Sequence, residues 1–157
     1  MPPRNEPGPL AGVLHAVLKP SGFRRKGDTW YGTGERTVLV VNLQASKYGT
    51  TSYLNIAVGV PELGCSAQPK EFECEARIRV AALAPDDRQR LEKVMDLGCA
   101  EFGDPERAHA FRDFLTNNVL PFLGRIRSLD GLREEVGTGA FTRGIVDYRL
   151  KEWLGMS

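Results

Sequence analysis

The chain has 157 residues, of which 41% are hydrophobic and 26% are charged, and its formal net charge at pH 7 is +1. These values are ordinary for a globular protein, and the length allows a single domain with a sizeable buried core. A net charge near zero provides no general attraction to nucleic acid or to an anionic membrane surface, so neither is an expected partner. The sequence contains no run of 18 apolar residues, and no membrane-spanning helix is predicted.

Residue types that commonly bind metals are scarce. Three cysteines and two histidines are scattered along the chain without a Cys-x-x-Cys pair: Cys65, Cys74, Cys99, His15 and His109. This spacing contains no zinc motif, and we expect no metal and no cofactor. Reduced thiols fit a cytoplasmic location. Residues 1–8 lack the apolar segment of a signal peptide and are predicted to be a flexible tail before a single α+β domain, residues 9–157.

The first predicted elements are a helix and two short strands. Apolar residues at helical spacing predict a helix over residues 9–19, which ends before Pro20. Two short strands are predicted over residues 23–26 and 29–31, and the chain turns between them at Gly27.

The segment from Arg36 to Val60 reads as one long β-hairpin. Side chains alternate between the two faces of a strand, and each arm of this hairpin has one apolar row. The rows are Leu39, Val41, Leu43 and Ala45 in the first arm and Leu54, Ile56, Val58 and Val60 in the second. Only pairings whose two positions sum to an odd number place both rows on the same face of the sheet. We expect that face to be buried.

The bend of the hairpin is predicted at Gly49 and Thr50. Glycine tolerates positive φ and therefore suits the first central position of a type II′ turn. A two-residue bend places Tyr48 opposite Thr51 and satisfies the odd-sum condition. In this register Gln44 lies opposite Asn55, Ser46 opposite Tyr53, and Asn42 opposite Ala57.

The rest of the chain is predicted to contain one more strand and several helices. Strict alternation predicts a half-exposed strand over residues 71–80, with glutamates and arginines on its outer face. Helices are predicted from about Pro85 to Gly98, from Asp104, and from about Thr142 to Leu154. This order predicts an α+β fold with an N-terminal helix, an antiparallel meander sheet of about five strands, and C-terminal helices packed on one sheet face.

The polar face of the hairpin is the first candidate site. It gathers amide, hydroxyl and phenol side chains, namely Asn42, Gln44, Ser46, Tyr53 and Asn55. Amides donate and accept hydrogen bonds, and tyrosine is frequent in binding surfaces. Two interpretations remain open: a solvated outer face, or partly buried groups that clamp the sheet or contact a ligand. Val38, Val40 and Ala57 share this face, which suggests that part of it is covered.

Charged clusters give weaker candidates. Arg24, in the run Arg24-Arg25-Lys26, could hold a phosphate or a carboxylate, although short basic runs are commonly solvated surface. The outer face of the predicted strand 71–80 carries three glutamates and two arginines, which we interpret as a solvated face whose charges neutralise one another. No Ser-His-Asp or Cys-His arrangement is visible, so no catalytic residue is predicted.

Several short motifs resemble a known bacterial family. The run Leu18 to Tyr31 reads LKPSGFRRKGDTWY, and it is followed by VVNLQASK from Val40, YLNI from Tyr53 and LPFL from Leu120. Together these motifs resemble the family catalogued as domain of unknown function 4304. The resemblance implies an α+β fold and a cytoplasmic bacterial protein, and it implies no activity. It matches Asn42, Gln44, Ser46 and Asn55, which the register also brings together.

These observations favour a non-enzymatic module that binds another protein or a peptide through the polar face of its sheet. An immunity-like role against a toxin is one version of this hypothesis, which rests on analogy between small domains. The alternative is an enzyme, or a protein that binds a small ligand or a nucleotide in a cleft on the exposed side of the sheet. Nucleic-acid binding is the least favoured reading, and the sequence leaves the oligomeric state open.

Overall fold

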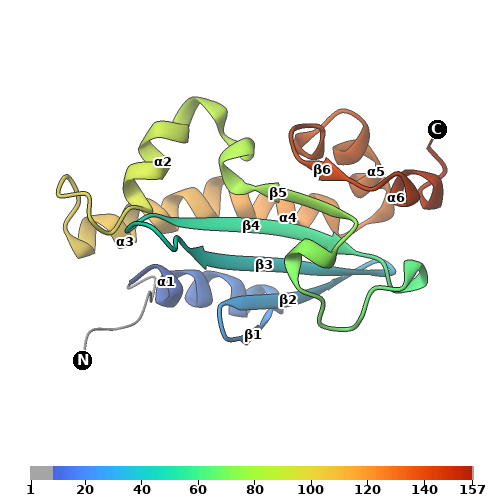
Figure 1. Ribbon diagram of the computed structural model, residues 1–157, viewed down its shortest axis with the longest axis horizontal. Helices are drawn as coiled ribbons and strands as arrows, with labels where there is room; N and C mark the ends of the chain where they lie inside the picture. Colours follow the sequence, from blue (N-terminus) through green and yellow to red (C-terminus); the bar gives the residue numbers. More distant parts are fainter. Residues whose placement is uncertain (1–8, 157) are drawn as a thin grey trace.

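The computed structural model describes residues 9–156 and contains helices at both ends of the chain and a sheet between them (Figure 1). The predicted tail, residues 1–8, and Ser157 lie outside the described residues. The α-helices are α1 (Pro9–Leu18), α2 (Arg88–Val94), α3 (Asp104–Phe114), α4 (Leu120–Ile126), α5 (Leu129–Gly137) and α6 (Tyr148–Trp153). The strands are β1 (Arg24–Lys26), β2 (Thr29–Gly34), β3 (Thr37–Ala45), β4 (Ser52–Gly59), β5 (Ala76–Arg79) and β6 (Ile145–Val146).

The six strands form one antiparallel sheet in the order β1-β2-β3-β4-β5-β6. The α+β meander predicted from the sequence is therefore confirmed, and β6 adds a short sixth strand from the C-terminal part of the chain. In Figure 1 the hairpin of β3 and β4 runs along the long axis of the molecule, with α2 near one end and β6 and α6 toward the other. Within residues 9–156, every helix is too short or too polar to cross a bilayer.

The two faces of the sheet are buried in different ways. The apolar rows predicted for the hairpin share the first face, and they are at most 1% exposed at Leu39, Val41, Leu43, Leu54, Ile56 and Val58. Helices pack their own apolar side chains into the same core, for example Leu14 of α1, Phe111 of α3 and Phe122 of α4. Burial of this continuous core is the main driving force for the fold.

The register of the hairpin differs from the predicted one by two residues. Asn42 pairs with Asn55, and Gln44 pairs with Tyr53. The paired positions still sum to an odd number, so both apolar rows face the core and both polar rows face the opposite side of the sheet. The bend is a four-residue loop over residues 47–50, because Ser46 N–H donates to the carbonyl of Thr51 at 3.0 Å. The predicted two-residue bend at Gly49 and Thr50 is wrong.

Contacts at the hairpin tip explain this longer loop. The carbonyl of Thr50 accepts from Leu97 N–H at 3.1 Å, and Ser52 N–H donates to the carbonyl of Met95 at 2.8 Å. Thr50 Oγ1 also donates to the Asp96 carboxylate. The tip is therefore docked on the segment between α2 and α3, and these distant contacts determine the length of the loop.

Three other predicted elements are shorter than expected. The helix predicted from about Pro85 to Gly98 is α-helical only at Arg88–Val94, after a 3-10 turn at Pro85–Asp87. The predicted strand over residues 71–80 is a strand only at Ala76–Arg79, because Glu71–Glu73 forms a 3-10 turn in which Lys70 N–H donates to Glu73 Oε1 at 2.8 Å. The predicted last helix begins only at Tyr148, because residues 145–146 pair with β5. The shorter strand follows from a local turn, and the later start of the last helix follows from long-range pairing that overrides a local periodicity.

The loop between β4 and β5 covers the middle of the second face. Val40 and Ala57 are 0% exposed there and form a small cluster with Cys74, which is 7% exposed. Tyr31 donates its hydroxyl to the carbonyl of Pro69 at 3.1 Å, which ties the loop to β2. The cover predicted from Val38, Val40 and Ala57 is thus present, and it leaves the hairpin-tip end of this face open.

Candidate functional site

A network of amide side chains lies on the open part of the second face. Asn55 Nδ2 donates to Asn42 Oδ1 at 3.2 Å and to Gln44 Oε1 at 3.1 Å. Asn42 Nδ2 in turn donates to Thr29 Oγ1 at 3.1 Å. Asn55 is only 5% exposed, whereas Gln44 is exposed. The buried amide therefore holds its two neighbours in place, as buried polar groups require partners.

This network fixes the direction in which Gln44 can donate. Its Oε1 accepts from Asn55, so its Nε2 points away from the network and toward solvent. The Gln44 side chain thereby presents two N–H donors on the open part of the second face. The buried Asn55 has a structural role in the network. The exposed Gln44 is available for a ligand.

Arg79 continues the same row of side chains on β5. It pairs with Asn55 across the sheet, and its guanidinium lies over the ring of Tyr53, with 4.0 Å between its Cζ and the ring centroid. Such cation–π contacts orient an arginine without neutralising it. Among residues 9–156, neither Arg77 nor Arg79 forms an ion pair with a carboxylate. The strand thus presents two positive charges that are outside the ion pairs of the described residues.

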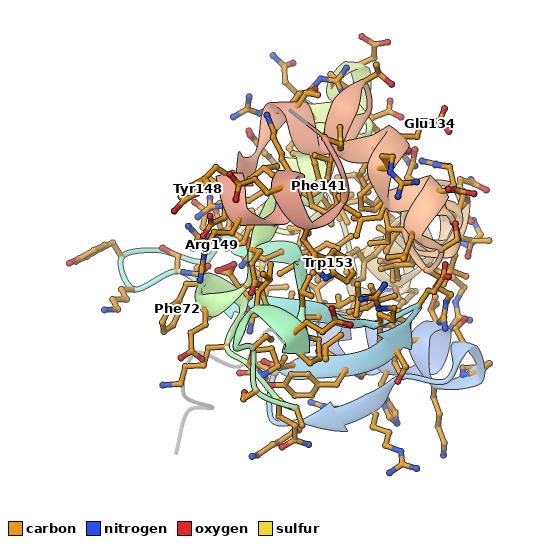
Figure 2. All side chains as sticks on the ribbon, turned by 90° about the vertical axis from the view of Figure 1, so that its right-hand side faces the viewer. Phe72, Glu134, Phe141, Tyr148, Arg149 and Trp153 are labelled. Carbon is orange, nitrogen blue, oxygen red and sulfur yellow. The ribbon has the colours of Figure 1, made fainter. Side chains whose placement is uncertain are left out.

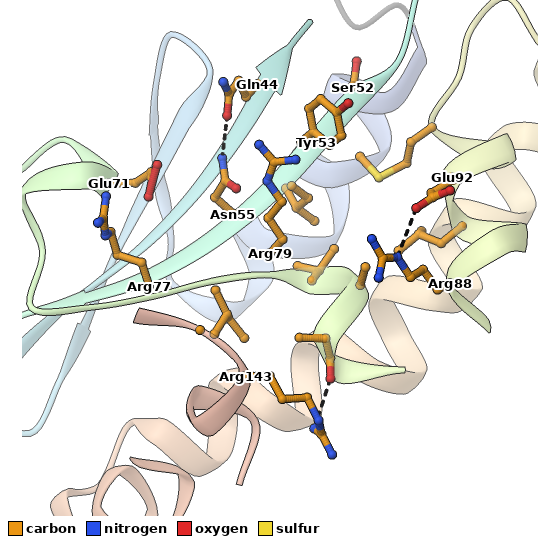
Figure 3. Close-up of a pocket in the computed structure, with 18 of the residues that line it drawn as sticks. Gln44, Ser52, Tyr53, Asn55, Glu71, Arg77, Arg79, Arg88, Glu92 and Arg143 are labelled. Carbon is orange, nitrogen blue, oxygen red and sulfur yellow. Dashed lines mark hydrogen bonds and ion pairs between the residues drawn. The ribbon is translucent and has the colours of Figure 1, made fainter. Parts of the chain in front are cut away.

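These side chains line a pocket of about 580 Å³ at the end of β5 (Figure 3). Gln44, Tyr53 and Asn55 form one wall, and Arg77 and Arg79 come from β5 itself. The opposite walls come from the segment around α2 and from the residues just before and within β6. β6 pairs only with Ala76 and Arg77, so the outer edge of β5 beyond Arg77 faces the pocket rather than another strand.

Six charged residues line the pocket, namely Arg77, Arg79, Arg88, Arg143, Glu71 and Glu92. Four arginines and two glutamates give these lining residues a net charge of +2. Arg88 is paired with Glu92, with 3.1 Å between Nε and Oε1. Arg143 donates from Nη1 to the carbonyl of Ala82 at 3.3 Å and keeps its charge. The pocket is therefore rich in donors and attractive to anions.

The structure brings together four of the six predicted site residues. Asn42, Gln44 and Asn55 form the network, and Tyr53 is part of the pocket wall with Gln44 and Asn55. Ser46 lies at the start of the hairpin loop, where its Oγ accepts from Tyr48 N–H at 3.2 Å. Arg24 is exposed on β1 at the far edge of the sheet and does not line the pocket.

The arginines of the pocket were not predicted as a site. The sequence places Arg77 and Arg79 on a strand face with three glutamates, which suggested mutual neutralisation. In the structure Glu75 turns inward, is 4% exposed and accepts from Val60 N–H at 3.3 Å, so it cannot serve the two arginines. Arg88 and Arg143 come from segments with no local sequence signal for this site. Only the pairing of Arg79 on β5 with Asn55 on β4 could have suggested part of this site.

Metal and thiol chemistry is not concentrated at the pocket. In the part of the chain that the structure describes, no group of three potential metal-ligating side chains comes together. Cys65 and Cys74 lie near each other in the loop that covers the second face, and burial raises the pKa of the Cys74 thiol above its usual range. A thiol held protonated in this way is a poor nucleophile.

Large apolar side chains are exposed on the surface, and one of them, Ile145, belongs to the pocket. Phe72 is 62% exposed, Ile145 is 58% exposed and lines the pocket, and Tyr148 is 69% exposed. Figure 2 shows Phe72 and Tyr148 projecting from the same side of the molecule, whereas Phe141 is directed into the interior. Exposed apolar groups beside a charged pocket are typical of protein interaction surfaces.

A family model described as "Domain of unknown function (DUF4304)" matches residues 14–125 of this chain. The match includes the second half of α1, the first five strands and most of α4, and it therefore includes the amide network and most of the pocket. The chain belongs to this family. No curated protein and no solved structure matches it.

Proposed function

We propose that this member of the DUF4304 family is a non-enzymatic binding module that engages another protein or a peptide through the polar face of its sheet. The observation that carries the proposal is the pocket at the end of β5, in which fixed amides and arginines with unneutralised charge lie beside exposed apolar side chains. These groups bind and orient a partner without supplying a reaction. Arginine and tyrosine are also the residues enriched in the energetic centres of protein interfaces.

Site-specific photo-crosslinking tests the proposal. A photoreactive amino acid at position 44 lies at the rim of the pocket, and the same amino acid at Glu106 lies exposed on α3, away from it. In cells that produce the protein, we expect one discrete cross-linked protein from position 44 and none from position 106. Tyr53→Ala should abolish this product, because it removes both a pocket wall and the support of Arg79. Absence of the product, or equal products from both positions, would contradict the proposal.

The volume of the pocket supports a second candidate function, the binding of a small anionic ligand or a nucleotide. Pockets for small molecules commonly measure about 300–1,000 Å³, and this one measures about 580 Å³. A thermal-shift screen of nucleotides, sugar phosphates and dicarboxylates tests this function directly. A ligand at about a hundredfold excess over its Kd stabilises the fold by about 2.7 kcal/mol. No shift across such a library would remove this candidate.

We also propose that the protein works in a bacterial cytoplasm. Cys65, Cys74 and Cys99 are free thiols in the structure, which supports a reducing compartment. Fractionation of the native host, followed by detection of the protein with an antibody, tests this location.

A further inference from the structure

We infer that the pocket at the end of β5 binds a phosphate monoester. This inference rests on the proposed binding function of the same pocket and names the chemical class that the pocket recognises. The phosphoryl group can belong to a phosphorylated side chain of a protein partner or to a small phosphorylated molecule. The chemistry at the pocket is the same for both sources.

The charge of the pocket matches this group. The six charged lining residues carry a net charge of +2, and a phosphate monoester carries about −1.5 to −2 at pH 7. Glu92 already partners Arg88, which leaves Arg77, Arg79 and Arg143 with Glu71 as the one other carboxylate in the described lining and a net charge of +2 (Figure 3). A single carboxylate would leave about one of these charges without compensation.

The donors of the pocket also match the acceptors of a phosphate. Three side chains present N–H groups that find no partner among residues 9–156: Gln44 at Nε2 and the guanidinium groups of Arg77 and Arg79. A phosphate monoester offers three strong acceptor oxygens, and arginine binds such oxygens in pairs. Three separate donor side chains therefore suit three oxygens better than they suit the two of a carboxylate.

Two of the three donor groups are held in position before any ligand arrives. Arg77 and Arg79 point to the same side of β5, with about 7 Å between their Cα atoms from strand geometry. The ring of Tyr53 supports Arg79, and Asn55 fixes the amide of Gln44. A preorganised site loses less conformational entropy on binding than a flexible one.

The same pocket has an apolar side for the organic part of the ligand. Leu54, Ile78, Met95 and Ile145 line it together with the charged residues. A phosphoryl group held by the arginines would place its ester substituent along these side chains. Organic phosphates should therefore bind more tightly than inorganic phosphate.

Isothermal titration calorimetry on the full chain tests the inference. The probes are inorganic phosphate, phenyl phosphate, and a short peptide with and without one phosphoserine. We expect phenyl phosphate and the phosphopeptide to bind, and Arg79→Gln or Arg77→Gln to weaken their binding about tenfold or more, as expected for loss of a charged hydrogen bond. Arg112→Gln removes the same charge from an exposed position on α3 and should leave the affinity unchanged.

The pH dependence gives an independent readout. The second pKa of a phosphate monoester is about 6, so affinity should fall as the pH decreases from 7.5 to 5.5 while the arginines stay charged. Tighter binding of the phosphopeptide than of phenyl phosphate would assign the phosphoryl group to a protein partner, and the reverse order would assign it to a small molecule. Circular dichroism of each variant confirms that the fold is intact.

Three results would overturn the inference: no binding by any phosphorylated probe, equal binding by the unphosphorylated peptide, or the same affinity in the Arg77 and Arg79 variants. These results are separable from failure of the proposed function. If position 44 still cross-links to a partner while the phosphorylated probes fail to bind, only the phosphate inference is wrong. If the cross-link is also absent, the proposed binding function is wrong as well.

Discussion

At the scale of single residues, Asn55 distinguishes the structural part of the amide network from its exposed end. It is 5% exposed and donates to both Asn42 and Gln44, whereas Gln44 is exposed and forms one of these bonds. We expect Asn55→Ala to lower the free energy of unfolding by about 1–3 kcal/mol, the usual cost of losing buried hydrogen bonds. Gln44→Ala should cost less than about 0.5 kcal/mol, as exposed substitutions do. Urea denaturation measures both, and equal losses would contradict this division of roles.

Arg107 is a second residue whose environment gives a clear expectation. It is 2% exposed, and its guanidinium donates to the carbonyls of five residues at the end of α2 and between α2 and α3: Lys93, Val94, Asp96, Cys99 and Phe102. This one side chain therefore organises the segment on which the hairpin tip docks. Because each buried acceptor left without a donor costs about 1–3 kcal/mol, Arg107→Met should destabilise the fold by at least about 3 kcal/mol.

Arg107→Lys should recover only part of that loss, since an ammonium group lacks the planar fork that reaches several carbonyls. The matched control is Arg112→Met, an exposed position on the same helix, which should change stability by less than about 0.5 kcal/mol. Chemical denaturation compares the three variants. A loss at Arg107 no larger than at Arg112 would show that the carbonyls are solvated in solution.

At the scale of secondary-structure elements, the hairpin shows how far the sequence could predict this molecule. Alternation of apolar residues correctly predicted which side chains of β3 and β4 share a face, because a one-residue slip would expose both apolar rows. It could not distinguish registers that differ by two residues, because both bury the same rows. The choice depends on Thr50 and Ser52, which bond to the distant segment after α2.

The turn glycines test this register. Gly49 does not have positive φ, and a Cβ atom there would meet nothing within 4 Å, so Gly49→Ala should change stability by less than about 0.5 kcal/mol. Gly27, in the turn between β1 and β2, is equally open but has φ of +63°. Gly27→Ala should therefore cost about 1–2 kcal/mol. If thermal denaturation shows the larger loss at Gly49, the loop has the type II′ geometry of the sequence prediction instead.

The docking of α6 should depend on pH through Glu62. Hydrogen bonds from Arg36 and Trp153 lower the pKa of the Glu62 carboxyl below its usual value. A group with a lower pKa in the folded state stabilises the fold above its ordinary pKa and loses this contribution as the pH falls through the folded-state pKa.

Glu62→Gln should consequently be less stable than the unmodified protein at pH 7, and the difference should shrink as the pH falls below the ordinary glutamate pKa of about 4.3 and vanish once Glu62 is protonated in the folded protein. Urea denaturation of both proteins at several pH values measures this difference. A difference that stays constant between pH 7 and pH 3 would mean that the carboxylate contributes through packing rather than through charge.

At the scale of the whole molecule, the candidate site exists only because distant segments meet. Local patterns predicted Gln44, Tyr53 and Asn55, which lie on one hairpin, and these residues do line the pocket. The arginines come from β5, from the first turn of α2 and from the segment before β6. Nothing in the local sequence around Arg88 or Arg143 reveals that they face the hairpin, because their positions depend on how β5 and β6 pair.

The unequal cover of the two sheet faces leaves one end of the second face open for the pocket, and Gly59 tests that cover. A Cβ atom at Gly59 would overlap Sγ of Cys65 and lie 3.5 Å from Sγ of Cys74, so the loop between β4 and β5 packs directly on this glycine. We expect Gly59→Ala to destabilise the fold by about 1–3 kcal/mol through overpacking. Adding Cys65→Ala removes the overlapping sulfur and should restore part of this loss, with a coupling of about 0.5–3 kcal/mol between the two sites. Strictly additive effects in urea denaturation would mean that the loop does not rest on Gly59 and that the second face is more open than described.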